Sequence, residues 1–400
     1  MSRDEHTIII GAGQSGLVMS HFLQLKDIPH TLIERARVAE RWRSERWDSL
    51  YFQFPNRFLR LPGMSHQSEA PDAFTHRDGV VDFLERYAAQ IAAPVRCGVA
   101  VEALATHASG GFRLETSMGP MRADNVVVAT GPYQSPAIPP FASGLTSDIA
   151  QLPASRYTNP GALPPGNVLV VGSGASGVQI ADDLISHGRT VYLSVGRHRR
   201  IPRRYNGKDA AEWSEALGLF DVNAANLPAG WRAPLITGVN GGYDVDLRAM
   251  ARRGLVLLGR VQDGADNQLT ISDDLDQHLD AGDATYDDAV ARIEAFIRGT
   301  PPPTPVAPGH LDTAIAEQSF DLAAEGVSSI IWATGYKYDF GWLPDEAVND
   351  AGAPLHERGV ASLPGLYFLG LFGLSAIRSS LFWGVADDAA RLADVIADAR

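Results

Sequence analysis

Two glycine-rich turns constrain this chain more than any other feature, because each stands between a short apolar run and a helix-like segment. The first turn, G-A-G-Q-S-G at residues 11–16, follows the β-branched run 6–10 and precedes the helical spacing of residues 17–25. A parallel strand that is buried on both faces is a continuous apolar run of this kind. The order of strand, glycine turn and helix is typical of a βαβ unit that binds a dinucleotide.

Each glycine of the first turn has a physical role. Gly11 permits the tight turn, Gly13 lets the backbone approach a pyrophosphate, and Gly16 allows the helix to touch the strand. The pyrophosphate is expected on the amide groups and positive dipole of the helix N-terminus. The next strand-like run ends in Glu34, 18 residues beyond Gly16, where a carboxylate accepts hydrogen bonds from an adenosine ribose. A plain glycine turn is the alternative, but strand, helix and acid in register favour dinucleotide binding.

The second turn, G-S-G-A-S-G at residues 172–177, is framed in the same way by an apolar run and a helical pattern. The strand expected after it, residues 190–195, ends in Ser194 and Val195 and has no carboxylate. The arginines that follow are Arg197, Arg199, Arg200, Arg203 and Arg204. Guanidinium groups in place of the acid indicate a site for the 2′-phosphate of NADP, with Arg197 as the best single candidate. A solvated basic loop and a nucleic-acid-binding arm are the alternatives.

Two dinucleotide units in one chain, of which only the first has the acid, favour FAD at the N-terminal unit and NADPH at the second. This order implies redox chemistry, because a flavin accepts the hydride of a reduced nicotinamide. The sequence therefore predicts an α/β fold with two Rossmann-like domains.

The composition is that of an ordinary globular protein, with 45% apolar and 20% charged residues among 400. The length predicts two or three domains, and the composition excludes disorder, collagen and coiled coil as the main architecture. Because 34 Lys and Arg face 47 Asp and Glu, the net charge of −13 offers no general attraction for nucleic acid or anionic lipid. The most apolar stretch, residues 363–377, is broken by proline and glycines and falls short of a bilayer span. We expect a cytoplasmic protein without a signal peptide or membrane segment.

Cys97 is the only cysteine. Because a single cysteine has no partner in the chain, an intrachain disulfide, a C-x-x-C redox pair, a thiolate zinc site and the chemistry of a disulfide reductase are excluded. The 11 histidines show no paired ligand spacing, so no metal site is predicted.

The ordered set of motifs resembles the single-component, NADPH-dependent flavin-containing monooxygenases, and in particular their small bacterial members. The resemblance covers nearly the whole chain. Besides the two glycine turns, the matching segments are R-W-R at residues 41–43, R-W-D-S-L at 46–50, L-P-G-M at 61–64, A-T-G-P-Y at 129–133 and W-A-T-G-Y at 332–336.

The resemblance implies two domains of three-layer ββα architecture, with an NADPH-binding domain at residues 151–327 inserted into an FAD-binding domain made of residues 1–150 and 328–400. It also implies the reaction. NADPH reduces FAD, O₂ adds to give a C4a-(hydro)peroxyflavin, and one oxygen atom passes to a small amine, sulfide or ketone. The alternatives are a flavin reductase or NADPH oxidase that oxygenates no substrate, and a redox sensor that binds both cofactors without turnover. The sequence leaves the oligomeric state open, and a homodimer is one alternative.

The chain departs from the family pattern at two places. The motif F-x-G-x-x-x-H-x-x-x-(F/Y) is represented by Phe141, Gly144 and Tyr157, but with altered spacing and with Pro153 in place of the histidine. Because proline offers no imidazole, this departure gives weight to the reductase alternative. Gln53 aligns with an asparagine that many relatives place beside the flavin, and a plain core or surface residue is its alternative role.

Gln53 and Arg378 are the predicted catalytic residues. Arg378 precedes a helix expected at residues 379–399, and it suits a substrate carboxylate, a cofactor phosphate or a structural salt bridge. Together they favour a polar or acidic small substrate in a pocket built by residues 52–75, 205–245 and 371–383. The predicted cofactor-binding residues are Gly11, Gly13, Gln14, Ser15, Gly16, Glu34, Arg35, Arg41, Trp42, Ala129, Thr130, Gly131, Gly172, Ser173, Gly174, Ala175, Ser176, Gly177, Ser194, Arg197, Arg203, Ala333, Thr334, Gly335, Ser379 and Leu381.

Overall fold

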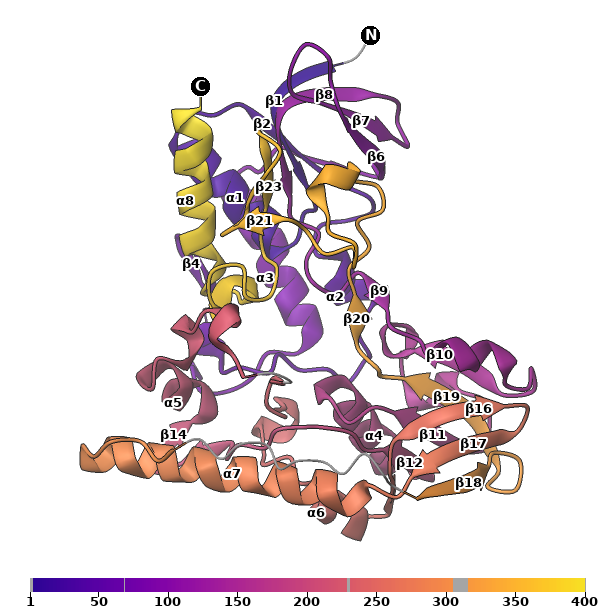
Figure 1. The fold of residues 1–400 in the computed structure, drawn as a ribbon. Coiled ribbons are helices and arrows are strands. Elements are labelled where there is room, and N and C mark those ends of the chain that lie inside the picture. The colour runs from indigo at the N-terminus through magenta and orange to yellow at the C-terminus, as the bar shows by residue number, and fades with distance from the viewer. Residues whose placement is uncertain (1–2, 68, 229–230, 305–315, 400) are drawn as a thin grey trace.

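The computed structural model describes residues 3–67, 69–228, 231–304 and 316–399. It contains two bodies, each built on a mainly parallel β-sheet (Figure 1). Both chain ends lie in the larger body, drawn in indigo, purple and yellow, and the pink and orange middle of the chain forms most of the smaller body. The predicted α/β class with two Rossmann-like sheets is confirmed.

The larger sheet has nine strands among the described residues, in the order β21-β22-β23-β8-β1-β2-β5, with the antiparallel strands β7 and β6 attached to β8. Central strand β1 runs parallel to β2 and β8, and its Ile8 and Ile9 have no exposed surface. This burial explains the uninterrupted apolar run of the sequence, because both faces of the strand are covered. The strands are β1 (Arg3–Ile10), β2 (His30–Glu34), β5 (Val95–Cys97), β6 (Val101–Thr106), β7 (Phe112–Thr116), β8 (Met121–Val128), β21 (His356–Glu357), β22 (Val360–Ala361) and β23 (Leu366–Phe368).

Helices α1 and α8 lie side by side against the larger sheet, although they come from opposite ends of the chain (Figure 1). The apolar positions of α8 that repeat at helical spacing, among them Leu392 and Ile396, have no exposed surface. The further elements of this body are α1 (Gln14–Leu25), α2 (Glu40–Ser44), β3 (Arg60–Leu61), β4 (Met64–Ser65), α3 (Arg77–Gln90) and α8 (Val385–Asp398).

The smaller sheet has the order β10-β19-β11-β12-β15, and all its strands are parallel. Along β11, Val168 and Val170 pack with α4, whereas Leu169 and Val171 pack toward the antiparallel sheet β16-β17-β18. The body therefore has the predicted three-layer ββα architecture. Its elements are β10 (Ala150–Pro153), β11 (Asn167–Val171), α4 (Ala175–Ser186), β12 (Val191–Ser194), β13 (Arg204–Tyr205), β14 (Lys208–Asp209), α5 (Ala210–Ala216), α6 (Leu247–Arg252), β15 (Leu255–Leu258), β16 (Val261–Ala265), β17 (Gln268–Ser272), α7 (Leu275–Arg298), β18 (Glu317–Asp321) and β19 (Val327–Trp332).

Strand β19 differs from the sequence expectation, which assigned residues from 328 onward to the larger body. It lies between β10 and β11 in the smaller sheet, with Ile330 and Ile331 fully buried. An apolar run of this kind fits either sheet, and only the pairing with β11 decides between them. The chain therefore returns to the larger body after Trp332.

The last helix also begins later than the predicted residue 379. Residues 377–380 form a short 3₁₀ turn and α8 starts at Val385. The Ser379 hydroxyl accepts hydrogen bonds from the N–H groups of Ser375 and Ala376, both at 3.1 Å. This local bonding competes with a regular helix, as serine side chains often do.

Two histidines are buried where α7 crosses the smaller sheet. His198 is 6% exposed and His278 on α7 is 1% exposed. A Cβ on Gly282 of α7 would lie only 2.3 Å from the His198 Nε2, so helix and ring are in close contact. Burial lowers the pKa of both imidazoles, although Asp274, 3.3 Å from the His278 Nε2, opposes this shift at His278.

These lowered pKa values predict that the protein loses stability in mild acid. The folded-state imidazoles take up protons less readily than those of the unfolded chain, which do so near the ordinary pKa of 6.5. Their contribution is complete above that value and is lost as the pH falls from there through the folded-state pKa values. We expect the thermal unfolding midpoint to fall between about pH 7.5 and about pH 5.5, and to fall less in His278→Gln. His187→Gln, which alters an exposed histidine, is the control, and equal falls in His278→Gln and the parent would contradict the assignment.

Candidate functional site

The two glycine turns have nearly the same geometry. The first glycine of each has a positive φ, +108° at Gly11 and +109° at Gly172, which glycine adopts at little cost. A Cβ on Gly16 would lie 1.9 Å from the Gly11 carbonyl oxygen, and a Cβ on Gly177 would lie 1.9 Å from the Gly172 carbonyl oxygen. Each helix therefore begins in direct contact with its turn, as the sequence predicted.

The middle glycines leave both helix N-termini open. A Cβ on Gly13 or Gly174 would meet no atom of the described chain within 4 Å. No described side chain caps α1 or α4, and the first turn of neither helix contains an acid. Uncapped N–H groups and the helix dipole fit a pyrophosphate at each turn. The predicted residues that complete these helix starts are Gln14, Ser15, Ala175 and Ser176.

Glu34 lies at the end of β2 and binds the first turn. Its two carboxylate oxygens accept hydrogen bonds from the backbone N–H groups of Ala12 and Ala36, both at 3.0 Å. Each oxygen keeps lone-pair capacity for a ribose hydroxyl. The predicted placement of a carboxylate beside the first turn is therefore present in the structure.

The second unit has hydroxyl groups at the corresponding places. The Ser173 hydroxyl donates to the Gly196 carbonyl at 3.1 Å and accepts from the Gly196 N–H at 3.0 Å. Ser194, a predicted cofactor ligand, is buried and donates to the Gly259 carbonyl at 3.1 Å. The structure thus engages Ser194 in the packing of the sheet, whereas Ser173 ties the turn to the loop that follows β12.

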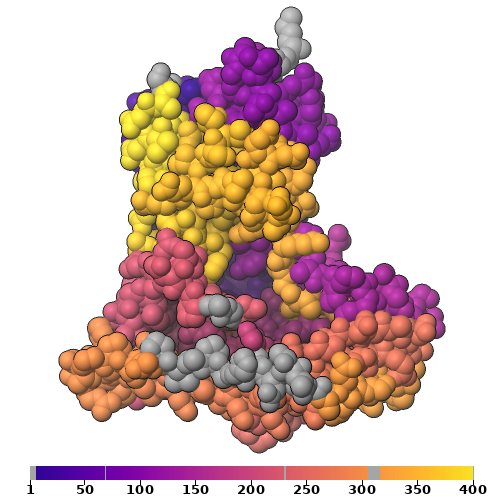
Figure 2. All heavy atoms as spheres, viewed as in Figure 1, coloured from indigo at the N-terminus to yellow at the C-terminus, as the bar shows by residue number. Residues whose placement is uncertain are grey.

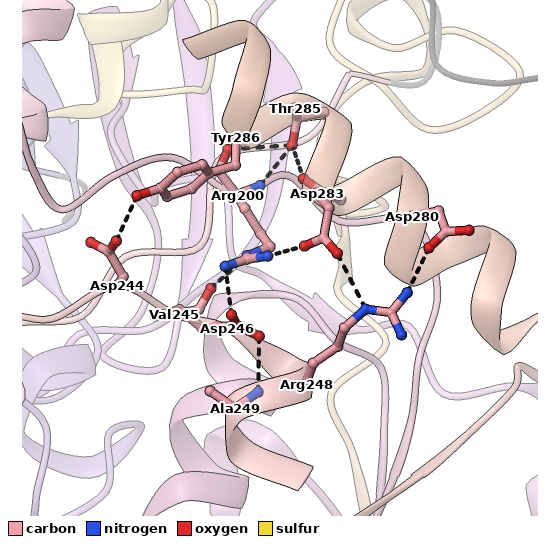
Figure 3. A network of polar contacts seen from close by, with 11 residues as sticks. Arg200, Asp244, Val245, Asp246, Arg248, Ala249, Asp280, Asp283, Thr285 and Tyr286 are labelled. Carbon is pink, nitrogen blue, oxygen red and sulfur yellow. Dashed lines mark hydrogen bonds and ion pairs between the residues drawn. The ribbon is translucent and has the colours of Figure 1, made fainter. Parts of the chain in front are cut away.

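Several of the arginines after β12 are held by acidic side chains or carbonyl groups. Figure 3 shows Arg200 between Asp283 of α7 and Asp246 at the start of α6. Its guanidinium also lies over the Tyr286 ring, 5.2 Å from the centroid. Arg248 bonds the same Asp283 at 3.2 Å. This network binds α6 and α7 to the loop and neutralises the charge of Arg200.

Arg197 differs from its neighbours. Arg199 lies over the Trp231 ring at 5.6 Å, and Arg204 donates to the Gly241 carbonyl at 2.7 Å. Within the part of the chain that the structure describes, the Arg197 guanidinium makes no hydrogen bond or ion pair. It is therefore available to an anion on the loop that Ser173 holds.

Arg203 lies apart from this loop surface. Its side chain is 2% exposed, bonds Asp209 at 3.0 Å and donates to the Gln53 carbonyl of the larger body at 2.8 Å. The Phe74 ring lies 4.5 Å from the guanidinium carbon. The structure places Arg203 at the joint between the bodies, where burial leaves it no surface for a 2′-phosphate, contrary to the sequence prediction.

Three predicted residues follow the first βαβ unit. Trp42 packs edge-on against Phe52, with ring centroids 6.3 Å apart. Arg35 and Arg41 both form ion pairs with Glu45, at 3.1 and 2.8 Å. Both guanidinium groups are thus partly neutralised within the fold.

The C-terminal segment reaches the first turn. The Gln14 side-chain amide donates to the Ser380 carbonyl at 2.7 Å. Ser379 and Leu381, both predicted at the first cofactor, lie on either side of this contact. Because the Ser379 hydroxyl accepts from the Ala376 N–H, its oxygen is engaged in the local turn.

Two A-T-G segments carry the chain between the bodies. Residues 129–131 follow β8 and residues 333–335 follow β19. A Cβ on Gly11 would lie 2.8 Å from the Ala129 carbonyl oxygen, and one on Gly172 would lie 2.5 Å from the Ala333 carbonyl oxygen. The linkers then pair antiparallel as β9 (Ser135–Pro136) and β20 (Tyr336–Lys337). Both crossings therefore start beside a glycine turn.

The two predicted catalytic side chains are placed differently. The half-buried Gln53 carboxamide makes no hydrogen bond within the described residues. Arg378 forms ion pairs with Asp221 and Asp387, both at 2.9 Å. This is the structural salt bridge that the sequence kept as an alternative, and it neutralises the charge that favoured an acidic substrate.

Sequence reasoning did not identify an aromatic cluster between the bodies. The Trp383 ring centroid lies 4.9 Å from that of Phe54, 4.8 Å from that of Phe58 and 5.3 Å from that of Phe220. The rings come from the three segments expected to build the pocket, and Figure 2 shows a hollow between the two bodies. The density of aromatics near residue 54 was a signal, but nothing in the sequence paired them with Phe220.

No group of three or more His, Cys, Asp or Glu side chains among the described residues is placed to hold a metal ion. None of the helices described is both long and apolar enough to cross a bilayer.

Comparison with known proteins identifies the family. A family model described as pyridine nucleotide-disulphide oxidoreductase matches residues 8–209. The chain belongs to this family. An uncharacterised CzcO-like oxidoreductase of Geobacillus kaustophilus is 33% identical over 96% of this chain and 95% of its own length. Membership confirms a flavin-dependent oxidoreductase that uses a pyridine nucleotide, and the family implies FAD and NADPH as its cofactors.

Two comparisons connect the chain with flavin monooxygenases. The structure of a flavin monooxygenase mutant from Stenotrophomonas maltophilia superposes with a TM-score of 0.70 at 18% identity, over 99% of both chains. The indole-3-pyruvate monooxygenase YUCCA1 of Oryza sativa subsp. japonica is 34% identical over 184 residues, which is 45% of each chain. The resemblance to single-component flavin-containing monooxygenases that the motifs indicated is confirmed at the level of family and fold.

The close contact at Gly16 and the open space at Gly13 predict different effects of alanine at these two positions. In Gly16→Ala the new Cβ meets the Gly11 carbonyl oxygen at 1.9 Å, so α1 must shift. We expect a loss of stability on the order of 3 kcal/mol and loss of bound FAD. In Gly13→Ala the Cβ has space, so we expect stability within about 1 kcal/mol of the parent but weaker FAD binding.

Thermal unfolding and the flavin content after purification measure these effects. Gly13→Ala serves as the matched control, because it adds the same methyl group to the same turn. Equal behaviour of the two variants would show that the contact between α1 and the turn is not required.

Proposed function

We propose that this protein is an NADPH- and O₂-dependent flavin monooxygenase that inserts one oxygen atom into a small organic substrate, at nitrogen, at sulfur or beside a carbonyl group. The observation that carries the proposal is that the chain has a single cysteine, although its family is named after disulphide oxidoreductases, which need a pair of cysteines. Cys97 stands exposed at the end of β5 and has no second cysteine in the chain with which to form a redox disulfide. The similarity to monooxygenases supports O₂ as the electron acceptor.

The residues of the chain bind and orient the reactants in this proposal. FAD supplies the redox chemistry by accepting the hydride of NADPH and, once reduced, by activating O₂. The α1 N-terminus and Glu34 would hold the FAD pyrophosphate and ribose, and the α4 N-terminus and Arg197 would hold those of NADPH. The rings of Trp42, Phe52 and Phe382 pack against one another and would exclude water from the reacting atoms in this proposal.

Gln53 is proposed as the residue that contacts the reacting atoms. Its carboxamide offers two N–H donors and one acceptor that no described residue uses. For Arg378 we propose a structural role, because Asp221 and Asp387 occupy its guanidinium. The segment that carries it is thereby joined to the smaller body.

The FAD-binding and NADPH-binding assignments of the larger and smaller body are part of the proposal. We propose boundaries near residue 150 and at residue 332, where β19 ends. A cytoplasmic location and a homodimer stay predictions.

An NADPH oxidase that releases H₂O₂ is the second candidate function. The observation in its favour is Pro153, which ends β10 beside Trp332 where the family motif has a histidine. A pyrrolidine ring cannot take part in the hydrogen bonds that an imidazole makes. The redox sensor without turnover is the third reading.

Product analysis tests the function. The flavin-loaded protein is supplied with NADPH, ¹⁸O₂ and a panel of amines, sulfides and ketones. We expect one ¹⁸O atom in a product for each NADPH consumed, because a monooxygenase transfers one atom of O₂ and reduces the other to water. H₂O₂ in proportion to NADPH with every substrate would favour the oxidase, and negligible NADPH consumption would favour the sensor.

A second prediction concerns the choice between NADPH and NADH. Arg197→Ala is expected to raise KM for NADPH about tenfold or more, since one charge-assisted hydrogen bond contributes about 1.5–3 kcal/mol. KM for NADH should stay unchanged, because NADH lacks the 2′-phosphate. Arg204→Ala is the control from the same cluster, as its guanidinium is bonded to the Gly241 and Gly242 carbonyls. Parallel changes for both nucleotides in Arg197→Ala would contradict the assignment.

A further inference from the structure

Arg203 is a buried cation whose hydrogen bonds are incomplete. Its Nε bonds Asp209 at 3.0 Å and its Nη1 donates to the Gln53 carbonyl at 2.8 Å, while its Nη2 has no partner among the described residues. Burial disfavours the charged guanidinium and the nearby Asp209 opposes that effect, so the net direction is a lowered pKa at Arg203. Buried ion pairs with an unmet donor are often less stable than apolar side chains of the same volume. Stability alone therefore does not account for Arg203 at this place.

The segment that carries Gln53 is connected to both glycine turns. On the side of the larger body, the preceding Phe52 packs against Trp42 and against Phe382, with ring centroids 6.3 and 5.4 Å apart. Phe382 stands two residues after Ser380, whose carbonyl binds the Gln14 side chain at the start of α1. The chain before Gln53 is thus connected to the first glycine turn.

On the side of the smaller body, the same segment is connected to α4. A Cβ on Gly238 would lie 2.3 Å from the Phe52 carbonyl oxygen, so backbone meets backbone there. Two residues earlier, the Ile236 carbonyl accepts a hydrogen bond from the Gln179 side chain of α4 at 2.8 Å. The segment that carries Gln53 is therefore linked through neighbouring residues to both helices that follow the glycine turns.

Both peptide groups that flank Gln53 are held by the smaller body. The Phe52–Gln53 peptide is in contact with Gly238, and the carbonyl of the next peptide accepts from Arg203. Fixing two successive peptide planes fixes the direction of the Cα–Cβ bond between them. These contacts therefore fix the point and direction from which the Gln53 side chain leaves the backbone, while its own torsion angles aim the carboxamide, which no described residue bonds.

We propose that Arg203 is a positioning residue that holds Gln53 in the orientation needed at the reacting atoms. The proposal rests on the proposed function, which places the Gln53 carboxamide there. It gives Arg203 no contact with either cofactor. The adjacent Arg204 lies 6.0 Å from the same Phe74 ring but bonds carbonyls of the smaller body.

A double-mutant cycle under anaerobic conditions tests this role. The reduction of bound FAD by NADPH is followed as bleaching of the flavin in the parent, Arg203→Lys, Gln53→Ala and the double variant. Lysine keeps the charge beside Asp209, but its single nitrogen does not reproduce the two-pronged geometry of the guanidinium. We expect each single variant to slow reduction about tenfold, because misplacement of a positioned group by about 1 Å is costly. The double variant should be no slower than Gln53→Ala.

The control variant and the nucleotide preference separate positioning from other roles. Arg204→Lys should reduce FAD within about twofold of the parent rate. Arg203→Lys should keep the parent preference for NADPH over NADH, whereas a 2′-phosphate ligand would lose it. Should Arg203→Lys lose its flavin, Gly238→Ala displaces the Phe52–Gln53 peptide without altering Arg203 and carries the same expectation.

Three results would overturn the proposal. These are multiplicative effects in the double variant, an Arg203→Lys variant with the parent rate, or a slow Arg203→Lys variant beside a silent Gln53→Ala variant. The double-mutant cycle is run without oxygen, so its outcome does not depend on oxygenation. A failure to find oxygenated products in the ¹⁸O₂ experiment would contradict the monooxygenase function and leave the result of this cycle intact.

Discussion

Both dinucleotide sites depend on a contact in which a helix touches the carbonyl oxygen of the turn before it. A Cβ at Gly16 or Gly177 would stand 1.9 Å from that oxygen, so only glycine lets α1 and α4 begin so close to the sheet. The same approach aims the first N–H groups of each helix at one point, where an anion is stabilised. Gly11 and Gly172 in turn press against the ends of β8 and β19, from which the linkers start. The crossings between the bodies are thus positioned by the turns themselves.

The joint between the bodies shows how burial decides the role of an arginine. Arg200, Arg203 and Arg197 belong to one short basic segment, but Arg200 faces carboxylates from α6 and α7, and Arg203 faces Asp209 and a carbonyl of the other body. A buried guanidinium needs such partners, because its desolvation is costly. Arg197 has none among the described residues, which leaves its charge for a ligand. Arginines of the same segment therefore differ in role because their neighbours differ: Arg200 and Arg203 stabilise the fold, and Arg197 is available to a ligand.

Features that depend on neighbours in the sequence were predicted well. The strand, turn and helix of each unit and the acid at Glu34 follow from local spacing and apolar runs, and the three-layer architecture was implied by the family resemblance. The bonding partners that lie far away in the sequence were missed. Ser194 bonds Gly259, Arg203 bonds Gln53, and Arg378 bonds Asp221, and none of these pairs leaves a pattern in the chain. The start of α8 was placed too early for a different reason, since a serine hydroxyl competes with the helix there.

The sequence by itself determined two dinucleotide units, the order in which an acid marks the first and arginines mark the second, and the absence of a cysteine pair. These properties depend only on which residues occur and on their short spacing in the chain, so they do not depend on how the chain packs. Only the tertiary structure decided that β19 joins the smaller sheet, and that Arg197 and the Gln53 carboxamide stay unbonded among the described residues while their neighbours are engaged. The physical reason is that a hydrogen bond depends on where two groups meet in space, and Gln53 and Arg203 meet across 150 positions of the chain.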